Sequence, residues 1–167
     1  MQYIFLDIDG VLNTHYSMTK GLALNHLFHF QKSCVRELNR IIHRTGAKIV
    51  VSSTWRRHSN WLEVINHIGN EGVVGEIIDR TGRSDDRIRG HEIADWLSQH
   101  PETESFVILD DDSDMGRLMP RLVQTSMDGG LRRHHGDLAV KILDRKWHKA
   151  RFWHKGKAFC YKDSSRL

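Results

Sequence analysis

The sequence is poor in the features that stabilise secreted scaffolds or anchor membrane proteins. Its 167 residues include two cysteines, Cys34 and Cys160, and two prolines. Two isolated cysteines build no disulfide framework, and neither belongs to a C-x-x-C metal pair. No apolar run approaches the ~20 residues of a transmembrane helix, and no secretory signal pattern opens the chain. These absences exclude a disulfide-rich scaffold and a membrane protein, so we expect a soluble, cytoplasmic protein.

Positive charge is concentrated at the C-terminal end. Residues 145–167 hold eight Lys or Arg against one Asp, a net charge of +7, whereas residues 1–144 carry −3. The cations are interleaved with aromatic residues, namely Trp147, Phe152, Trp153, Phe159 and Tyr161. This pattern suits a nucleic-acid strand, because cations bind phosphates and rings stack on bases. It equally suits a last segment whose aromatic side chains pack on the body while its lysines face water.

Short apolar runs alternate with helical patterns along residues 1–144, which predicts an α/β domain with a mostly parallel sheet. We expect strands at 3–6, 47–51, 106–109 and 122–125, and helices at 31–45, 61–68, 91–100 and 137–147. Gly46 is expected to end the first of these helices. Leu62 and Leu138 are expected on buried helix faces. Segments 14–30 and 70–89 lack sustained periodicity. We therefore predict one domain over 1–144, followed by a basic tail over 145–167.

Polar clusters follow three of the expected strands. Asp7 and Asp9 follow the first, Ser52 and Ser53 the second, and the acidic run 110–114 the third. The carboxyl ends of parallel strands form the ligand-binding edge of such sheets. Clustered carboxylates repel one another unless a cation or proton intervenes, and hard oxygen ligands suit Mg²⁺. Strand-end caps and turns also use Asp and Ser, but three such clusters in this order favour a metal site.

These segments resemble motifs of the haloacid dehalogenase (HAD) superfamily. Residues 5–11, Phe-Leu-Asp-Ile-Asp-Gly-Val, are similar to its first motif, residues 49–52 to its second and residues 107–111 to its fourth. More narrowly, residues 52–56, 89–93, 109–115 and 123–125 are similar to the small HAD domains associated with RNA-repair proteins. The resemblance implies a HAD-like Rossmannoid three-layer sandwich. Its cap is expected to be minimal, because the segments that carry cap inserts are short, although residues 14–30 have room for a small cap loop.

The resemblance also implies catalytic roles for two aspartates. Asp7 would be the nucleophile that forms an aspartyl-phosphate, and Asp9 would protonate the leaving oxygen and later activate water. The presence of Asp9 indicates phosphoryl transfer rather than carbon–halogen cleavage. Gly10 would allow a sharp turn that brings backbone N–H groups to the phosphate.

Phosphate-binding groups are implied in the second and third motifs. The Ser52 hydroxyl would bind a phosphate oxygen with the Ser53 amide as a helper, although the choice between the two serines depends on where the strand ends. Arg89 would neutralise the phosphoryl group. Arg87 is the alternative for this role, because it lies close to the start of the same helix.

Mg²⁺ is the cofactor that the resemblance implies. Its expected ligands are Asp7, the backbone carbonyl of Asp9, and Asp111, with Asp110 close by. The alternative role for Asp112 and Asp114 is to cap the following turn, so the acidic run leaves the assignment open.

The implied function is a Mg²⁺-dependent phosphatase that removes a terminal phosphate from a nucleic acid or nucleotide. Residues 145–167 would then offer an additional nucleic-acid contact. Two alternatives stand beside it: a phosphatase for small molecules such as nucleoside monophosphates, and a non-catalytic HAD-fold module that binds nucleic acid or protein. The sequence carries no indication of oligomeric state.

Overall fold

The structure is a computed structural model that describes residues 1–23 and 29–147 of the chain. The strands are β1 (Gln2–Leu6), β2 (Lys48–Val51), β3 (Ile77–Arg80), β4 (Ser105–Asp110) and β5 (Leu122–Gln124). The helices are α1 (His15–Ala23), α2 (Lys32–Thr45), α3 (Trp61–Asn70), α4 (Arg89–Gln99) and α5 (Arg133–Leu143), with 3₁₀ turns η1 (Thr54–Arg57) and η2 (Gly116–Arg121). Within these two ranges, no helix is both long and apolar enough to cross a membrane.

The strands form one sheet in the order β3-β2-β1-β4-β5, and every neighbouring pair is parallel. β1 is central, and its last residue, Leu6, pairs with Val51 of β2 and Leu109 of β4. The residues that follow these three positions, Asp7, Ser52 and Asp110, therefore lie at the same level of the sheet. The chain passes from β1 to β2 on one side and returns to β4 on the other, which makes this edge the switch point where such sheets bind ligands.

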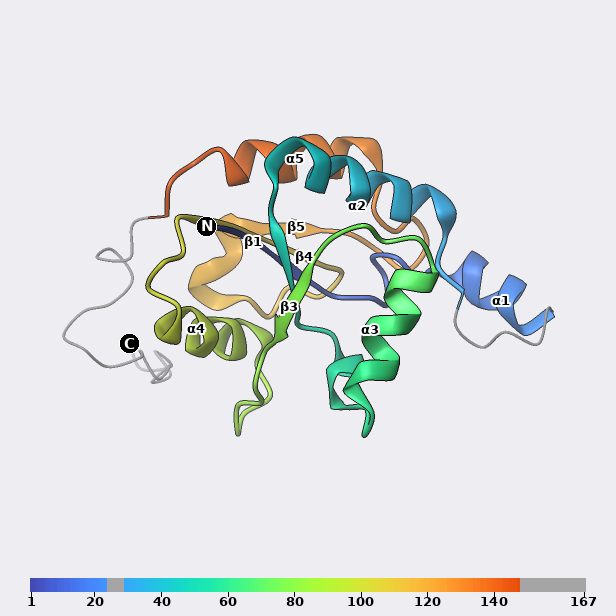
Figure 1. Cartoon of the computed structure of the whole chain (residues 1–167), viewed down its shortest axis with the longest axis horizontal. Coiled ribbons are helices and arrows are strands. Elements are labelled where there is room, and N and C mark those ends of the chain that lie inside the picture. Colours follow the sequence, from blue (N-terminus) through green and yellow to red (C-terminus); the bar gives the residue numbers. More distant parts are fainter. Residues whose placement is uncertain (24–28, 148–167) are drawn as a thin grey trace, which may run out of the picture.

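Helices cover both faces of the sheet (Figure 1), with α2 and α5 on one face and α4 on the other. Side chains of β1 alternate between the two faces, as expected of a buried strand. Ile4 and Leu6 belong to the core shared with α2 and α5, whereas Tyr3 and Phe5 pack in the core of α4. The layers form the expected α/β sandwich, and the sheet is parallel throughout.

Two elements lie in segments where the sequence predicts none. β3 is an edge strand within 70–89, and its residues alternate between half-buried and exposed, with Ile78 exposed. α1 lies within 14–30, and its Tyr16 and Met18 side chains are exposed. β3 buries no continuous apolar run, and residues 15–20 of α1 bury none either, which explains why hydrophobic periodicity misses both elements.

Two expected helices differ in their bounds and buried faces. The last helix spans Arg133–Leu143 rather than 137–147, and the backbone N–H of Arg132 donates to Nδ1 of His135 where it begins. Leu138 is 46% exposed and Leu62 is 62% exposed, so the expectation that both are buried was wrong. The packing partners of each helix decide which apolar side chains are covered, and these partners are distant in sequence.

The first aromatic residue of the basic tail packs on the body. The Trp147 ring lies 4.7 Å from the Phe106 ring, and its backbone N–H donates to the carbonyl of Glu104 at 2.6 Å. The Arg121 guanidinium lies 5.4 Å from the centre of the Trp147 ring. Trp147 thus packs in the core of the domain. The nucleic-acid contact expected of the tail concerns mostly residues 148–167, which lie outside the described residues.

Candidate active site

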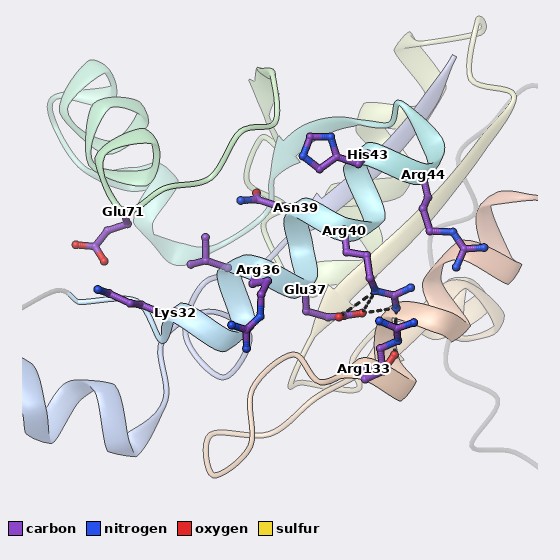
Figure 2. Close-up of a pocket in the computed structure, with 10 residues that line it drawn as sticks. Lys32, Arg36, Glu37, Asn39, Arg40, His43, Arg44, Glu71 and Arg133 are labelled. Carbon is purple, nitrogen blue, oxygen red and sulfur yellow. Dashed lines mark hydrogen bonds and ion pairs between the residues drawn. The ribbon is translucent and has the colours of Figure 1, made fainter.

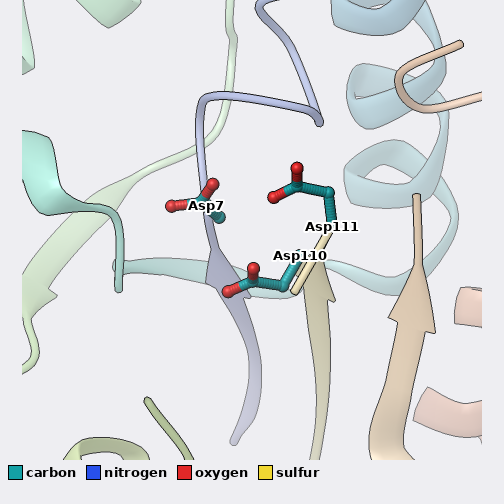
Figure 3. A group of neighbouring side chains, drawn as sticks. All are labelled: Asp7, Asp110 and Asp111. Carbon is teal, nitrogen blue, oxygen red and sulfur yellow. The ribbon is translucent and has the colours of Figure 1, made fainter. Parts of the chain in front are cut away.

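Three carboxylates converge at the carboxyl ends of β1 and β4 (Figure 3). Asp7 follows β1, Asp110 ends β4, and Asp111 comes next in the chain. One oxygen from each lies within 4.8 Å of the other two. Such proximity costs free energy while all three are ionised, unless a cation offsets their repulsion.

Burial raises the pKa of each of these carboxyl groups, and neighbouring carboxylates add to each shift. Burial raises the pKa of Asp110 to about 7, with a further contribution from the neighbouring Asp7. Burial also raises the pKa of Asp7, although Arg89 and a hydrogen bond from the Ser53 side chain oppose this shift. Oδ2 of Asp110 is buried and accepts no hydrogen bond within the described residues. This set of three carboxylates fits a divalent cation, and Oδ2 of Asp110 also forms an ion pair with Arg89 at 3.3 Å.

Arg89 places its guanidinium between two of the carboxylates. Its Nη1 lies 3.1 Å from Oδ1 of Asp7 and 3.3 Å from Oδ2 of Asp110. The backbone N–H of Arg89 donates to Oδ2 of Asp114 at 2.8 Å, which ties the start of α4 to the acidic run. Arg87, the alternative from sequence, is exposed and has a backbone φ of 59°. The structure therefore brings Arg89, rather than Arg87, into contact with the carboxylates.

Asp9 lies beside this cluster, with both carboxylate oxygens engaged elsewhere. Oδ1 accepts a hydrogen bond from the Asn13 side chain at 2.8 Å, and Oδ2 accepts one from Nε1 of Trp55 at 3.0 Å. Trp55 is half-buried and packs against the rings of Phe30 and His67. Sequence reasoning did not single out Trp55, although its place beside the two serines was a signal that it belongs to the site.

The two serines after β2 make different contacts. The Ser52 hydroxyl is fully buried without a hydrogen-bond partner among the described residues, while the Ser52 carbonyl accepts from Arg89. The Ser53 hydroxyl accepts from the backbone N–H of Trp55 at 3.3 Å, and its interaction with Asp7 opposes the rise in the pKa of that carboxyl group. The Ser53 amide donates to the Leu6 carbonyl at 3.3 Å. Ser53 is thus the serine whose side chain lowers the pKa of Asp7, whereas the Ser52 hydroxyl is left without a partner among the described residues.

Gly10 allows the loop after β1 to approach Asp111 closely. Its φ is 76°, a conformation that costs free energy for any residue with a Cβ. A Cβ at this position would lie 2.5 Å from Oδ2 of Asp111, well inside van der Waals contact. The Gly10 carbonyl accepts from the Thr125 hydroxyl at 2.7 Å. The expected sharp turn is present, and its main neighbour is a carboxylate of the cluster.

A buried arginine supports the loop that carries the serines. Nη1 of Arg56 donates to the carbonyls of Ser52 at 2.5 Å and Ser53 at 2.7 Å. Its other terminal nitrogen forms an ion pair with Glu92 of α4. Burial lowers the pKa of Arg56, although Glu92 opposes the shift. Sequence reasoning placed both residues within the family-like segments 52–56 and 89–93 but assigned them no role, because a charged side chain in a polar turn or helix is usually exposed.

An all-parallel sheet with carboxylates at the ends of β1 and β4 defines a HAD-like Rossmannoid domain. Residues 3–135 match the family described as "HAD domain in Swiss Army Knife RNA repair proteins", and the chain belongs to this family. Neither the curated proteins nor the solved structures contain a significant match. The resemblance drawn from the sequence motifs is thus confirmed at the level of the family.

Proposed function

We propose that the protein is a Mg²⁺-dependent phosphatase that acts through an aspartyl-phosphate and removes a terminal phosphate from a nucleic acid or nucleotide. Its membership of a HAD family indicates a hydrolase of the phosphatase type. The observation that carries the proposal is the cluster of Asp7, Asp110 and Asp111, with the Arg89 guanidinium against two of its members.

Asp7 is the proposed nucleophile. One carboxylate oxygen attacks phosphorus, so that an Asp–O–P bond forms as the bond to the leaving oxygen breaks. The Arg89 guanidinium, 3.1 Å from Oδ1 of Asp7, lies where it can stabilise charge on the phosphoryl oxygens. The buried Ser52 hydroxyl, which has no hydrogen-bond partner among the described residues, is a further proposed donor to them.

Asp9 is the proposed general acid and base. It gives a proton to the leaving oxygen and then takes one from the water that hydrolyses the aspartyl-phosphate. Hydrogen bonds from Asn13 and Trp55 fix the orientation of its carboxylate. The proton balance is complete, because the proton given to the leaving group is recovered from water.

Mg²⁺ would be held by the carboxylates of Asp7, Asp110 and Asp111 together with the backbone carbonyl of Asp9. When bound, the ion supplies positive charge that offsets the carboxylates and polarises phosphate oxygens. Asp110 lies in the same cluster of carboxylates as Asp7 and Asp111, which supports its inclusion beside Asp111.

The family description supports a nucleic-acid substrate with a phosphorylated end, because the related domains occur in RNA repair proteins. A mononucleotide carries the same terminal group, so substrate length separates the proposal from a small-molecule phosphatase. A non-catalytic binding module would bind such ligands without releasing phosphate.

The test measures phosphate release from 3′- and 5′-phosphorylated oligonucleotides and mononucleotides, with Mg²⁺ or EDTA. Wild type is compared with Asp7→Asn and with Asp112→Asn, which changes an exposed aspartate two residues beyond Asp110. We expect Mg²⁺-dependent release that Asp7→Asn abolishes and Asp112→Asn largely retains. Absence of release from every substrate, with oligonucleotide binding intact, would overturn the phosphatase and favour the binding module.

A further inference from the structure

A groove of about 640 Å³ runs along the exposed side of α2, outside the acidic crevice that Asp7, Asp110 and Asp111 line. Figure 2 shows its lining, which comes mainly from α2, with Arg133 of α5 and Glu71 at its borders. Its cationic lining residues are Lys32, Arg36, Arg40, Arg44 and Arg133, accompanied by His43. Among the described residues, the only apolar side chain that lines it is Val35, which is buried.

Four of these cations recur every four residues along one helix. Lys32, Arg36, Arg40 and Arg44 follow one another along α2 (Figure 2), and each step of four residues rises about 6 Å. Lys32 and Arg36 form no ion pair within the described residues, whereas Arg40 pairs with Glu37 and Asp137. The groove thus presents a line of positive charge in which several cations are available to a ligand.

The groove begins beside the loop that carries Asp9. The backbone N–H of Gln31, which precedes α2, donates to the carbonyl of Leu12 at 2.8 Å. The backbone N–H of Leu131, shortly before α5, donates to the carbonyl of Val11 at 2.8 Å. Lys32, at the start of α2, therefore lies toward the candidate site, and the line of cations runs away from it along α2. Arg133 lies beside Arg40, which donates to the Arg133 carbonyl at 3.3 Å.

We infer that this groove binds the phosphodiester backbone of a single-stranded nucleic acid whose phosphorylated end occupies the acidic crevice. A line of spaced cations matches a polyanion with one charge per nucleotide, and such contacts do not depend on base sequence. Within the described part of the chain, the lining offers no exposed apolar side chain that would enter a lipid surface. The placement of the phosphorylated end of the nucleic acid at the acidic cluster rests on the proposed function, whereas the binding of its backbone along α2 does not.

Binding is measured without turnover, by fluorescence anisotropy of a labelled, unphosphorylated single-stranded RNA 12-mer in EDTA. The variants are Arg36→Gln and the triple Lys32→Gln/Arg36→Gln/Arg44→Gln. The matched control is Lys48→Gln, which removes one charge at the start of β2, on the opposite edge of the sheet from the carboxylates. Thermal melting verifies that every variant is folded.

We expect Arg36→Gln to weaken binding about threefold to fivefold and the triple variant about 30-fold or more, with Lys48→Gln close to wild type. The slope of log K against log salt should become shallower by roughly 0.7 for each phosphate that the protein no longer neutralises. Equal weakening by Arg36→Gln and Lys48→Gln, or an acidic peptide that competes as well as unlabelled RNA, would overturn the inference.

The same variants separate this inference from the proposed function. RNA binding that requires the α2 cations, without phosphate release from any substrate, would support binding along the groove and overturn the proposed phosphatase activity. If phosphate is released and the triple variant binds RNA as tightly as wild type, the proposed phosphatase activity stands and the inferred binding along the groove is overturned.

Discussion

Arg56 and Glu92 form an ion pair that is buried beneath the candidate site, with side chains 6% and 4% exposed. Arg56 belongs to η1, directly after the serines, and Glu92 lies three residues after Arg89 in α4. The pair therefore joins the loop that carries the serines to the helix that carries Arg89. Its geometry sets the separation between the serines and Arg89, the groups proposed to bind one phosphate.

Glu92→Gln should destabilise the protein by about 3 kcal/mol, because it leaves the buried Arg56 without its counterion. The control is Glu76→Gln, which removes the partner of Lys48 from a largely exposed ion pair and should cost less than about 1 kcal/mol. Urea denaturation measures both free energies of unfolding. Similar small costs for the two variants would show that Arg56 does not depend on Glu92.

Gly10→Ala should both destabilise the fold and weaken Mg²⁺ binding, because its Cβ would displace the Asp111 carboxylate. Gly46→Ala is the matched control, since Gly46 also has a positive φ, 66°, but no described atom lies within 4 Å of a Cβ added there. Gly46→Ala should lower the free energy of unfolding by about 1–2 kcal/mol, the cost of holding a residue with a Cβ at a positive φ. The readout is the increase in melting temperature on addition of Mg²⁺, which Gly46→Ala should retain and Gly10→Ala should lose. A retained increase in both variants would contradict the role assigned to Gly10.

Arg89→Met should lower kcat for phosphate release about 10²- to 10³-fold, the typical cost of removing one donor to transition-state charge. Arg87→Met tests the other arginine near this helix start and should leave kcat within about twofold of wild type, because Arg87 is exposed and pairs with no carboxylate of the described cluster. Steady-state kinetics on a phosphorylated oligonucleotide measures both. A larger loss in Arg87→Met than in Arg89→Met would reverse the assignment.

The metal-free protein should lose stability as pH rises from about 4 to about 7. Burial and the neighbouring Asp7 raise the pKa of Asp110 from 3.8 to about 7, so the folded state holds this proton more tightly than the unfolded state. Asp110→Asn should remove part of this loss and be more stable than wild type at pH 8 in EDTA, with a smaller difference at pH 5. Part of the decrease in unfolding free energy with rising pH should remain in Asp110→Asn, because burial also raises the pKa of Asp7.

Urea denaturation at both pH values measures the change, and repetition with Mg²⁺ supplies the control. Mg²⁺ should stabilise wild type at pH 8 and should stabilise Asp110→Asn much less. A variant that is less stable than wild type at pH 8 in EDTA would contradict the unfavourable ionisation of Asp110.

Elements with strong local signals could be predicted from sequence. α2 spans Lys32–Thr45 against an expected 31–45, and Gly46 ends it with a φ of 66°, as expected. β4 was predicted from its apolar run, and the structure extends it to Asp110. A continuous apolar run or a full apolar stripe along a helix is such a signal, because it favours the same type of secondary structure whatever part of the protein covers it.

Residues whose roles depend on distant partners could not be predicted. No local pattern indicates that Trp55 contacts Asp9, that Arg56 contacts the serine carbonyls, or that Arg56 pairs with Glu92. The acidic run 110–114 likewise left its members equivalent until the fold separated them. Asp110 and Asp111 join the cluster with Asp7, whereas Asp112 is exposed and Asp114 holds the start of α4.

Motif order and hydrophobic patterning were enough to predict the family, the parallel α/β architecture and the strand ends at which polar groups gather, because both are local properties of the chain. Three contacts required the folded chain: Arg89 rather than Arg87 meets the carboxylates, Nε1 of Trp55 donates to Asp9, and Trp147 packs in the core. Each of these contacts joins segments far apart in the sequence. Their formation follows from strand register and helix packing, which no local pattern specifies.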